Sequence, residues 1–368
     1  MLRNPFTPGF GLHPAVLIGR EQVVDAISSA FDTQANPFRT TWLRGPSGTG
    51  KTTLLDAIQG QAGLAGWIVV QEDAAGPDLP GRIVQRLAAH QPTPRGRGGR
   101  VSARVGLPGA EVQYEYQREG QVVVERSVRD ALEAVVEQPG VNGVLVTIDE
   151  VHTADHEHLA IIGNAVQHLL RGTAPRSVAL IVAGLPQPTL ATGDERRLAT
   201  FLTRCRPVEV DQLSDAAVRS GLQATARAGG RAFAPDALSL AVTASAGYPF
   251  MLQLVGWHAW EQQLDGQPIR RESVVAALPR ADHDLRRAVL MPIARPLSAM
   301  DQKYLRAMAE DQGPSNTGDI ADRLGRSSQY AGVYRDRLIE LGLIQSTGHG
   351  VVDFAIPGLR ALYRSPVD

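Results

Sequence analysis

A run of eight residues at positions 45–52 has the composition of a loop that binds phosphate. Its sequence is Gly-Pro-Ser-Gly-Thr-Gly-Lys-Thr, which fits the pattern G-x-x-x-x-G-K-[ST] at every position. Glycines let backbone N–H groups approach an anion closely, and a helix that starts here adds its dipole. In this pattern Lys51 reaches the β- and γ-phosphates, and the Thr52 hydroxyl ligates Mg²⁺. The residues expected to hold the nucleotide are Gly45, Pro46, Ser47, Gly48, Thr49, Gly50, Lys51, Thr52 and Thr53.

A pair of carboxylates supplies what a hydrolytic site needs beyond phosphate binding. Asp149 and Glu150 directly follow the apolar stretch 144–148, about 100 residues after the phosphate loop. A carboxylate at the end of a parallel strand can hold the Mg²⁺ shell, which we assign to Asp149. The next carboxylate can orient and deprotonate the attacking water, which we assign to Glu150. The alternative is that both residues are solvated polar groups at a strand end.

Short apolar runs that alternate with helical patterns must position these residues. The runs read as buried strands, at 40–43, 67–70, 144–148, 178–183 and 207–210. Between them the spacing of apolar residues predicts helices at 21–31, 81–90, 128–136 and 159–170. Strands alternating with helices predict an α/β fold, in which a parallel sheet is covered by helices on both faces.

The remaining chain divides into further units. We assign residues 1–212 to the phosphate-binding core, with an insertion or hairpin at 91–120 that carries Pro, Gly and Arg residues. A wholly helical pattern predicts an all-α unit at 213–279. Pro279, Pro292 and Pro296 predict a linker over 280–296. The last unit, 297–368, has three helical patterns followed by two short strands joined by a glycine-containing turn.

Composition limits the classes of function. The 368 residues are 43% hydrophobic and 20% charged with a formal net charge of −1, so there is no bulk attraction to nucleic acid or to an anionic membrane. The single cysteine, Cys205, excludes an internal disulfide and a cysteine-based zinc site. We find no signal-peptide pattern and no apolar run long enough to span a bilayer, and expect a cytoplasmic protein without a membrane partner.

Together these motifs resemble those of AAA+ P-loop ATPases, closest to the origin-recognition-like branch and related to bacterial signalling P-loop ATPases. The segments that carry the resemblance are Ile-Gly-Arg-Glu at 18–21, the phosphate loop, Ile-Asp-Glu-Val-His at 148–152, Ala-Gly-Leu-Pro at 183–186 and Gly-Tyr-Pro-Phe at 247–250. The resemblance implies ATP or ADP with Mg²⁺ as cofactors, a helical lid over 213–279, and a base pocket formed by Ile18, Gly19 and Arg20 with Pro249 from the lid. The alternative for residues 16–20 is a simple helix N-cap region.

Two departures from the family pattern bear on catalysis. The end of the strand at 178–183 offers Ala183-Gly184-Leu185 where a polar sensor residue is common, and the lid offers Tyr248-Pro249-Phe250 where an arginine is common. Both favour slow or partner-stimulated hydrolysis, or a nucleotide-held switch. An arginine acting on a neighbouring copy would come from Arg196, Arg197, Arg204 or Arg206, with Arg204 favoured. Alternatively these arginines are simply solvated.

The family also implies that the last unit is a winged helix-turn-helix. Its third helix would enter the major groove of double-stranded DNA through Arg326, Ser328, Gln329, Arg335 and Arg337. Residues 298–368 hold 8 Lys/Arg against 9 Asp/Glu, however, which offers little charge for DNA. A protein partner or intramolecular docking is the alternative. The leading hypothesis is an ATPase switch that acts on DNA or a protein partner, with ATP-dependent homo-oligomerisation a candidate. The rivals are a non-hydrolysing nucleotide-dependent scaffold and a DNA-binding regulator.

Overall fold

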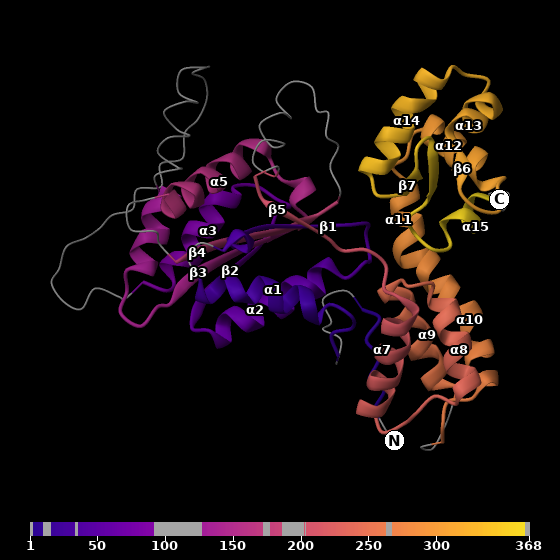
Figure 1. Ribbon diagram of the computed structural model, residues 1–368, viewed down its shortest axis with the longest axis horizontal. Coiled ribbons are helices and arrows are strands. Elements are labelled where there is room, and N and C mark those ends of the chain that lie inside the picture. The colour runs from indigo at the N-terminus through magenta and orange to yellow at the C-terminus, as the bar shows by residue number, and fades with distance from the viewer. Residues whose placement is uncertain are drawn as a thin grey trace.

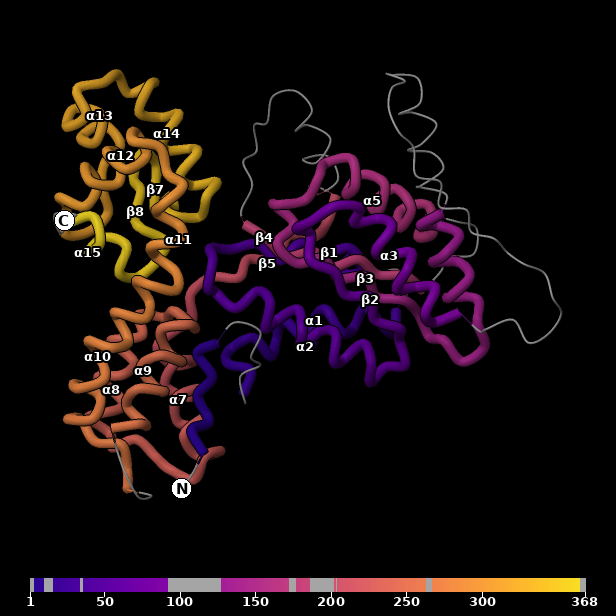
Figure 2. The backbone as a smooth tube through the Cα atoms, turned by 180° about the vertical axis from the view of Figure 1, so that it is seen from behind, coloured from indigo at the N-terminus to yellow at the C-terminus, as the bar shows by residue number. Residues whose placement is uncertain are grey.

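The computed structural model describes residues 3–9, 16–33, 36–91, 127–171, 177–185, 202, 204–262 and 267–364. The chain forms an α/β core on one side and a column of helices on the other, with the C-terminal elements stacked on the lid helices (Figure 1). Seen from behind, the N-terminal segment runs along the lid before the chain enters the core (Figure 2). The insertion expected at 91–120 lies, except for Gln91, outside the described residues. Within the described residues no helix is long and apolar enough to cross a membrane.

The core is a five-stranded sheet in which every pairing is parallel. The strands lie in the order β2-β3-β4-β1-β5. Their bounds are β1 Thr40–Arg44, β2 Trp67–Asp73, β3 Gly143–Asp149, β4 Val178–Gly184 and β5 Arg206–Glu209. Each residue of β3 and β4 is buried, as expected for central strands covered on both faces. The predicted α/β fold class is confirmed.

Helices cover the two faces of the sheet in separate layers (Figure 1). One face carries α1 (Glu21–Asp32) and α2 (Lys51–Leu64), which share a hydrophobic cluster with Leu43 and Ile181. The other face carries α3 (Leu79–Ala88), the helix at 127–136 and α5 (His156–Arg171). Two short 3₁₀ turns, η1 (Pro37–Arg39) and η2 (Val151–Thr153), lead into β1 and out of β3.

Residues 215–285 form a bundle of four helices, for which we keep the name lid, and the N-terminal segment packs on it. Its elements are α7 (Asp215–Ala228), α8 (Pro235–Ser245), α9 (Pro249–Glu261) and α10 (Arg271–Leu285). Phe6 is completely buried against the edges of Phe233 and Trp260. A side chain at Gly256 would collide with the Phe6 ring, so this glycine allows the N-terminal segment to pack on α9.

The prediction of a linker over 280–296 is wrong. The chain stays helical there: α10 continues through Pro279 to Leu285, then comes a π-helical turn, η3 (Arg286–Leu290), and then α11 (Met291–Ala294). Pro292 has no N–H to donate, which suits a helix whose ladder is already disturbed by a π turn. Leu285, Val289 and Leu290 are buried in the cluster that joins the lid to the C-terminal elements. The prolines thus predicted a linker in a segment that stays helical because its apolar side chains are buried.

The C-terminal elements follow the predicted order of helices and strands. They are α12 (Ala299–Ala309), β6 (Ser315–Asn316), α13 (Thr317–Leu324), α14 (Ser328–Glu340), β7 (Ile344–Gly348), β8 (Val351–Phe354) and α15 (Leu359–Arg364). The strands form an antiparallel sheet in the order β6-β8-β7. Side-chain caps fix three helix starts, since Ser298, Asn316 and Ser327 each accept a backbone N–H. The assignment of this unit as a winged helix remains a prediction.

Candidate nucleotide site

The phosphate loop lies between the end of β1 and the start of α2, at the carboxyl edge of the sheet. Gly48 and Gly50 adopt φ values of +77° and +89°, which only glycine takes without strain. Gly45 passes so close to the Val210 carbonyl that a Cβ would lie 2.4 Å from that oxygen. The glycines of the motif are therefore required by the backbone path as well as by room for an anion.

Lys51 is buried and bonded to its own loop. Its Nζ donates to the Gly45 carbonyl oxygen at 2.9 Å and to the Pro46 carbonyl oxygen at 2.8 Å. The side chain is 5% exposed, and burial lowers the pKa of its ammonium, an effect opposed by Glu150 and Asp149. These carbonyl bonds hold the ammonium at the loop, where it can exchange them for phosphate oxygens.

The two carboxylates lie beside the loop because β3 ends next to it across β4. Asp149 Oδ2 accepts from the Thr52 hydroxyl at 2.5 Å, so the two predicted magnesium ligands lie together. A hydroxyl and a carboxylate that bond each other offer oxygen ligands of the kind that Mg²⁺ prefers. Burial and the Asp149 charge raise the pKa of Glu150, while Lys51 lowers it.

His152 lies next to Glu150 on the turn after β3. Its Nε2 is 3.3 Å from Glu150 Oε2. Burial and the Lys51 charge lower the pKa of this imidazole, whereas Asp149 and Asp73 raise it. In the sequence His152 belongs to a family motif, and with His156 and His158 it has a spacing compatible with a metal, although a solvated polar helix start is the favoured interpretation.

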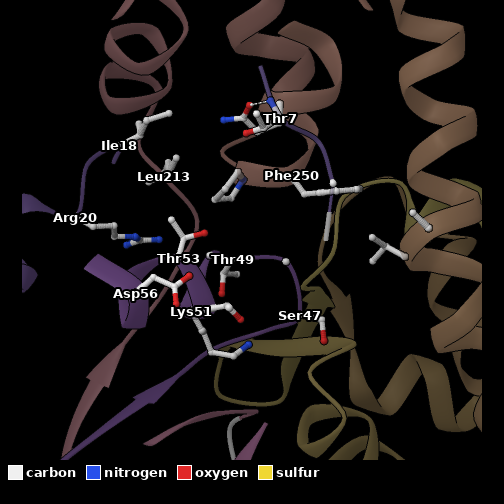
Figure 3. A pocket seen from close by; sticks show the side chains of 18 of the residues that line it. Thr7, Ile18, Arg20, Ser47, Thr49, Lys51, Thr53, Asp56, Leu213 and Phe250 are labelled. Atoms are coloured by element: carbon white, nitrogen blue, oxygen red, sulfur yellow. Dashed lines mark hydrogen bonds between the residues drawn. The ribbon is translucent and has the colours of Figure 1, made fainter. Parts of the chain in front are cut away.

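A cavity of about 460 Å³ extends from the phosphate loop to the lid (Figure 3). Of the residues predicted to bind or act on nucleotide, its walls contain Ile18, Arg20, Ser47, Gly48, Thr49, Gly50, Lys51, Thr52, Thr53, Glu150 and Pro249. Gly19, Gly45, Pro46 and Asp149 are not among the residues that line it. The opposite walls contain Phe250, from the Gly-Tyr-Pro-Phe segment, and residues that no motif indicated: Thr7, Leu213, Gln253, Ala288, Val289, Pro292 and Ile293.

The segment before α1 is fixed against the lid. A Cβ at Gly19 would lie 2.8 Å from that of Ala217, and Ile18 occupies the space that a side chain at Gly221 would take. Arg20 donates to the Asp211 carbonyl oxygen, and burial lowers the pKa of its guanidinium. The predicted base-binding segment therefore lies between the core and the first lid helix.

The lid touches the phosphate loop directly through the start of α9. The Tyr248 hydroxyl donates to the Ser47 carbonyl oxygen at 2.7 Å. Pro249 Cγ is 3.9 Å from the position that a Cβ on Gly50 would occupy. Tyr248 has no exposed surface, and burial raises the pKa of its phenol. Its hydroxyl is 1.9 Å from where a Gly48 Cβ would stand, which makes that glycine a condition for the contact.

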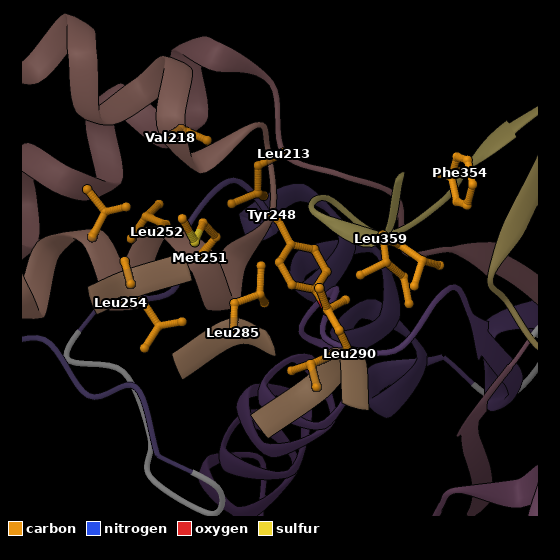
Figure 4. Packing of buried hydrophobic residues seen from close by; sticks show 14 of the residues in the cluster. Leu213, Val218, Tyr248, Met251, Leu252, Leu254, Leu285, Leu290, Phe354 and Leu359 are labelled. Atoms are coloured by element: carbon orange, nitrogen blue, oxygen red, sulfur yellow. The ribbon is translucent and has the colours of Figure 1, made fainter. Parts of the chain in front are cut away.

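The C-terminal elements reach the same loop from the other side. Pro46 Cα is 3.4 Å from the position of a Cβ on Gly342, in the turn after α14. Gln212 donates to the Ala355 carbonyl oxygen at 3.2 Å, and Gly358 packs on Leu285 and Leu290. Tyr248, Leu290 and Leu359 belong to one buried cluster (Figure 4).

Other predicted residues lie away from the cavity. Arg204 is exposed before β5, at the amino edge of the sheet, and donates to Gln167 on α5 at 3.1 Å. It lies away from the site of its own chain, which leaves a trans role and simple solvation as the two interpretations. Arg196 and Arg197 lie outside the described residues, and Arg206 stacks on Phe38. On α14 and the turn before it, Arg326, Ser328, Gln329 and Arg337 are exposed, whereas Arg335 is half-buried and paired with Asp336.

Comparison with known proteins agrees with this geometry. Residues 16–182 match the family model of the AAA ATPase domain, and residues 288–362 match a domain of unknown function, DUF8462. The match over residues 16–182 includes both the phosphate loop and the Asp149–Glu150 pair. Residues 16–182 are an AAA-type ATPase domain. No curated protein matches the chain in sequence.

Two solved structures show how far the ATPase fold extends along the chain. A Walker-type ATPase of Pyrococcus abyssi superimposes with a TM-score of 0.64 at 15% identity, covering 95% of this chain and 96% of that one. Cdc6p from Pyrobaculum aerophilum gives a TM-score of 0.50 at 15% identity, covering 97% and 95%. At these identities the likeness is one of fold. It spans the ATPase domain, the lid and the C-terminal elements together.

Proposed function

We propose that the protein is a Mg²⁺-dependent ATPase in which bound nucleotide controls the arrangement of the lid and the C-terminal unit. One observation carries this proposal: the cavity that contains the phosphate loop and Glu150 is also lined by residues of the lid and of η3–α11. A ligand in this cavity would touch the ATPase domain and the elements that bear the C-terminal unit at the same time.

The residues fit nucleotide hydrolysis in a consistent way. Loop N–H groups and Lys51 bind the phosphates, and the Thr52 hydroxyl and Asp149 carboxylate would hold Mg²⁺, which when bound neutralises phosphate charge. Glu150 orients a water and accepts its proton. The adenosine would lie against Ile18, Leu213 and Phe250.

The control function rests on contacts made by the loop itself. The loop is bonded to the lid through Tyr248 and touched by the C-terminal unit at Gly342. A nucleotide that draws the Lys51 ammonium away from the Gly45 and Pro46 carbonyls would change the loop at the residues next to both contacts. Differential contact with two arrangements is what a ligand needs to shift their populations.

Calorimetry with Mg²⁺-ATP tests the binding site. Lys51→Ala should weaken ATP binding by about 100-fold, since a charge-assisted contact contributes up to about 3 kcal/mol. The other lysine of the chain, Lys303, is exposed on α12, so Lys303→Ala is a matched control. ATP binding by wild type that Lys51→Ala leaves unchanged would refute the site.

Glu150→Gln separates hydrolysis from a switch that only binds. Loss of phosphate release with ATP binding retained supports the ATPase, and Glu157→Gln, an exposed change on α5, should leave the rate unchanged. An equally flat baseline in wild type and variant supports the non-hydrolysing scaffold instead.

DNA binding by α14 is a second candidate function. It is favoured by the exposed Arg326, Gln329 and Arg337, and opposed by Val333, which is 64% exposed on the same helix. Fluorescence anisotropy on duplex DNA at two salt concentrations tests it. Salt-sensitive binding that Arg326→Ala weakens supports DNA, and its absence favours a protein partner.

A further inference from the structure

The chain turns sharply at the end of β3, and this turn places a histidine on the proposed general base. Glu150 has φ 51° and ψ 37°, a left-handed conformation that is rare outside glycine. Its N–H donates to Asp149 Oδ1 at 2.8 Å, and its carbonyl oxygen accepts from the Thr153 N–H and hydroxyl at 2.8 and 2.9 Å. These bonds fix η2 directly after the carboxylates.

Gly184 gives η2 the room to close over the end of β4. A Cβ at this position would lie 2.7 Å from Val151 Cγ1 and 3.4 Å from the His152 backbone nitrogen. Any larger residue at the end of β4 would therefore displace the turn that carries His152. The same absence of a side chain means that β4 brings no polar group to Glu150 from this position.

The polar group that does lie beside the Glu150 carboxylate is the His152 imidazole. Its Nε2 lies 3.3 Å from Glu150 Oε2, and the ring is 24% exposed against 46% for the Glu150 side chain. The Nδ1 atom is buried and has no hydrogen-bond partner in the described part of the chain. An Nε2–H that donates to the carboxylate leaves Nδ1 as the acceptor, with no positive charge needed on the ring.

We propose that His152 is a positioning residue of the ATPase, which holds the Glu150 carboxylate in the orientation that faces the cavity. A half-exposed glutamate samples several rotamers, and a hydrogen bond from a ring fixed on η2 selects one. This inference rests on the proposed hydrolysis by Glu150. It adds a residue whose effect is on the rate of the chemical step and not on nucleotide affinity.

The test is steady-state and single-turnover hydrolysis of Mg²⁺-ATP by His152→Ala, His152→Gln and the control His168→Ala, which is exposed on α5. We expect His152→Ala to lower kcat by about 10- to 100-fold with KM and ATP affinity unchanged, because loss of positioning should cost no more than the about 10²- to 10⁴-fold that the general base itself contributes. His152→Gln keeps an N–H donor and should recover part of the rate. His168→Ala should match wild type.

A second measurement separates positioning from a general loss of structure. In the Glu150→Gln background, which has no carboxylate to orient, His152→Ala should cause no further loss of single-turnover rate. A full additive loss there, or a fall in ATP affinity with kcat unchanged, overturns the proposal. Wild-type hydrolysis that His152→Ala leaves unchanged overturns this inference alone, whereas absence of hydrolysis in wild type overturns the proposed ATPase with it.

Discussion

The two ends of the cavity are built in opposite ways. The phosphate end comes from one contiguous loop and two adjacent carboxylates, held by backbone geometry and hydrogen bonds. The far end is mostly apolar and comes from five separate places, namely the N-terminal segment, residues 16–20, Leu213, the start of α9 and η3–α11. Residues that bind the phosphates of any nucleoside triphosphate can thus come from short local motifs. The rest of the cavity wall depends on how separate units pack together.

This difference also indicates where control can enter. The phosphate end sits at the carboxyl edge of the sheet, whereas the far end belongs to elements of the cluster that joins the lid and the C-terminal unit. Altering the phosphate end should stop binding. Altering the far end should change affinity or coupling by smaller amounts.

The largest effect should come from Gly48→Ala at the phosphate end. The residue has φ +77°, and its Cβ would stand 1.9 Å from the Tyr248 hydroxyl oxygen, so both the loop and its lid contact must move. We expect ATP affinity to fall by about 100-fold, because left-handed strain of about 1–2 kcal/mol adds to the lost contact. Gly60→Ala is the control, since it lies in α2 with nothing within 4 Å. Equal ATP affinities in the two variants would contradict the role of Gly48.

The sequence predicted these two ends unequally, for a physical reason. Gly45–Thr52 and Asp149–Glu150 could be recognised because close backbone approach and metal ligation require particular residue types at fixed spacing. The strands and most helices followed from apolar periodicity, and α/β class with them. Residues 288–293 gave no such signal: their wall needs only apolar side chains, and Pro292 suggested a linker. The Thr7 N–H donates to Gln253 Oε1 at 2.9 Å. This contact joins segments 246 residues apart in the sequence, so no local pattern could predict it.

Val289→Ala tests the far end, with a smaller effect. Val289 is buried on the π turn and lines the cavity, so removing two methyl groups should cost up to about 1.5 kcal/mol of contact with the nucleoside. We expect KM for ATP to rise by about tenfold with kcat unchanged, because uniform binding is lost. Val275→Ala is the matched control, being 52% exposed on α10. A fall in kcat at constant KM would show that this wall acts on the chemical step.

Tyr248→Phe cuts the bond that joins the lid to the phosphate loop. It removes one hydroxyl and leaves the Ser47 carbonyl oxygen without that donor, so urea unfolding of the nucleotide-free protein should become easier by about 1 kcal/mol. Tyr330→Phe is the control, because Tyr330 is exposed and its hydroxyl meets only that of Tyr334 in the described bonds. Stability equal to wild type would mean that the hydroxyl contributes nothing to holding the lid.

Lowering the pH should affect the two ends of the cavity differently. Near neutral pH this effect on kcat should be the smallest of those predicted. Burial and Asp149 raise the pKa of Glu150 above its ordinary 4.5, so this base takes up its proton at a higher pH than a solvated glutamate. The base form exists above that pKa, and kcat should therefore fall as pH is lowered, by about tenfold per pH unit once the pH is below the pKa.

Adenosine carries no phosphate and binds at the apolar end, so its affinity is the control and should stay constant over the same pH range. The residual rate of Glu150→Gln should lack this acidic limb, because an amide at this position has no proton to gain. If kcat of wild type and adenosine affinity declined together, the pH effect would arise from loss of the fold, and the division between a polar, titrating end and an apolar, inert end would not hold.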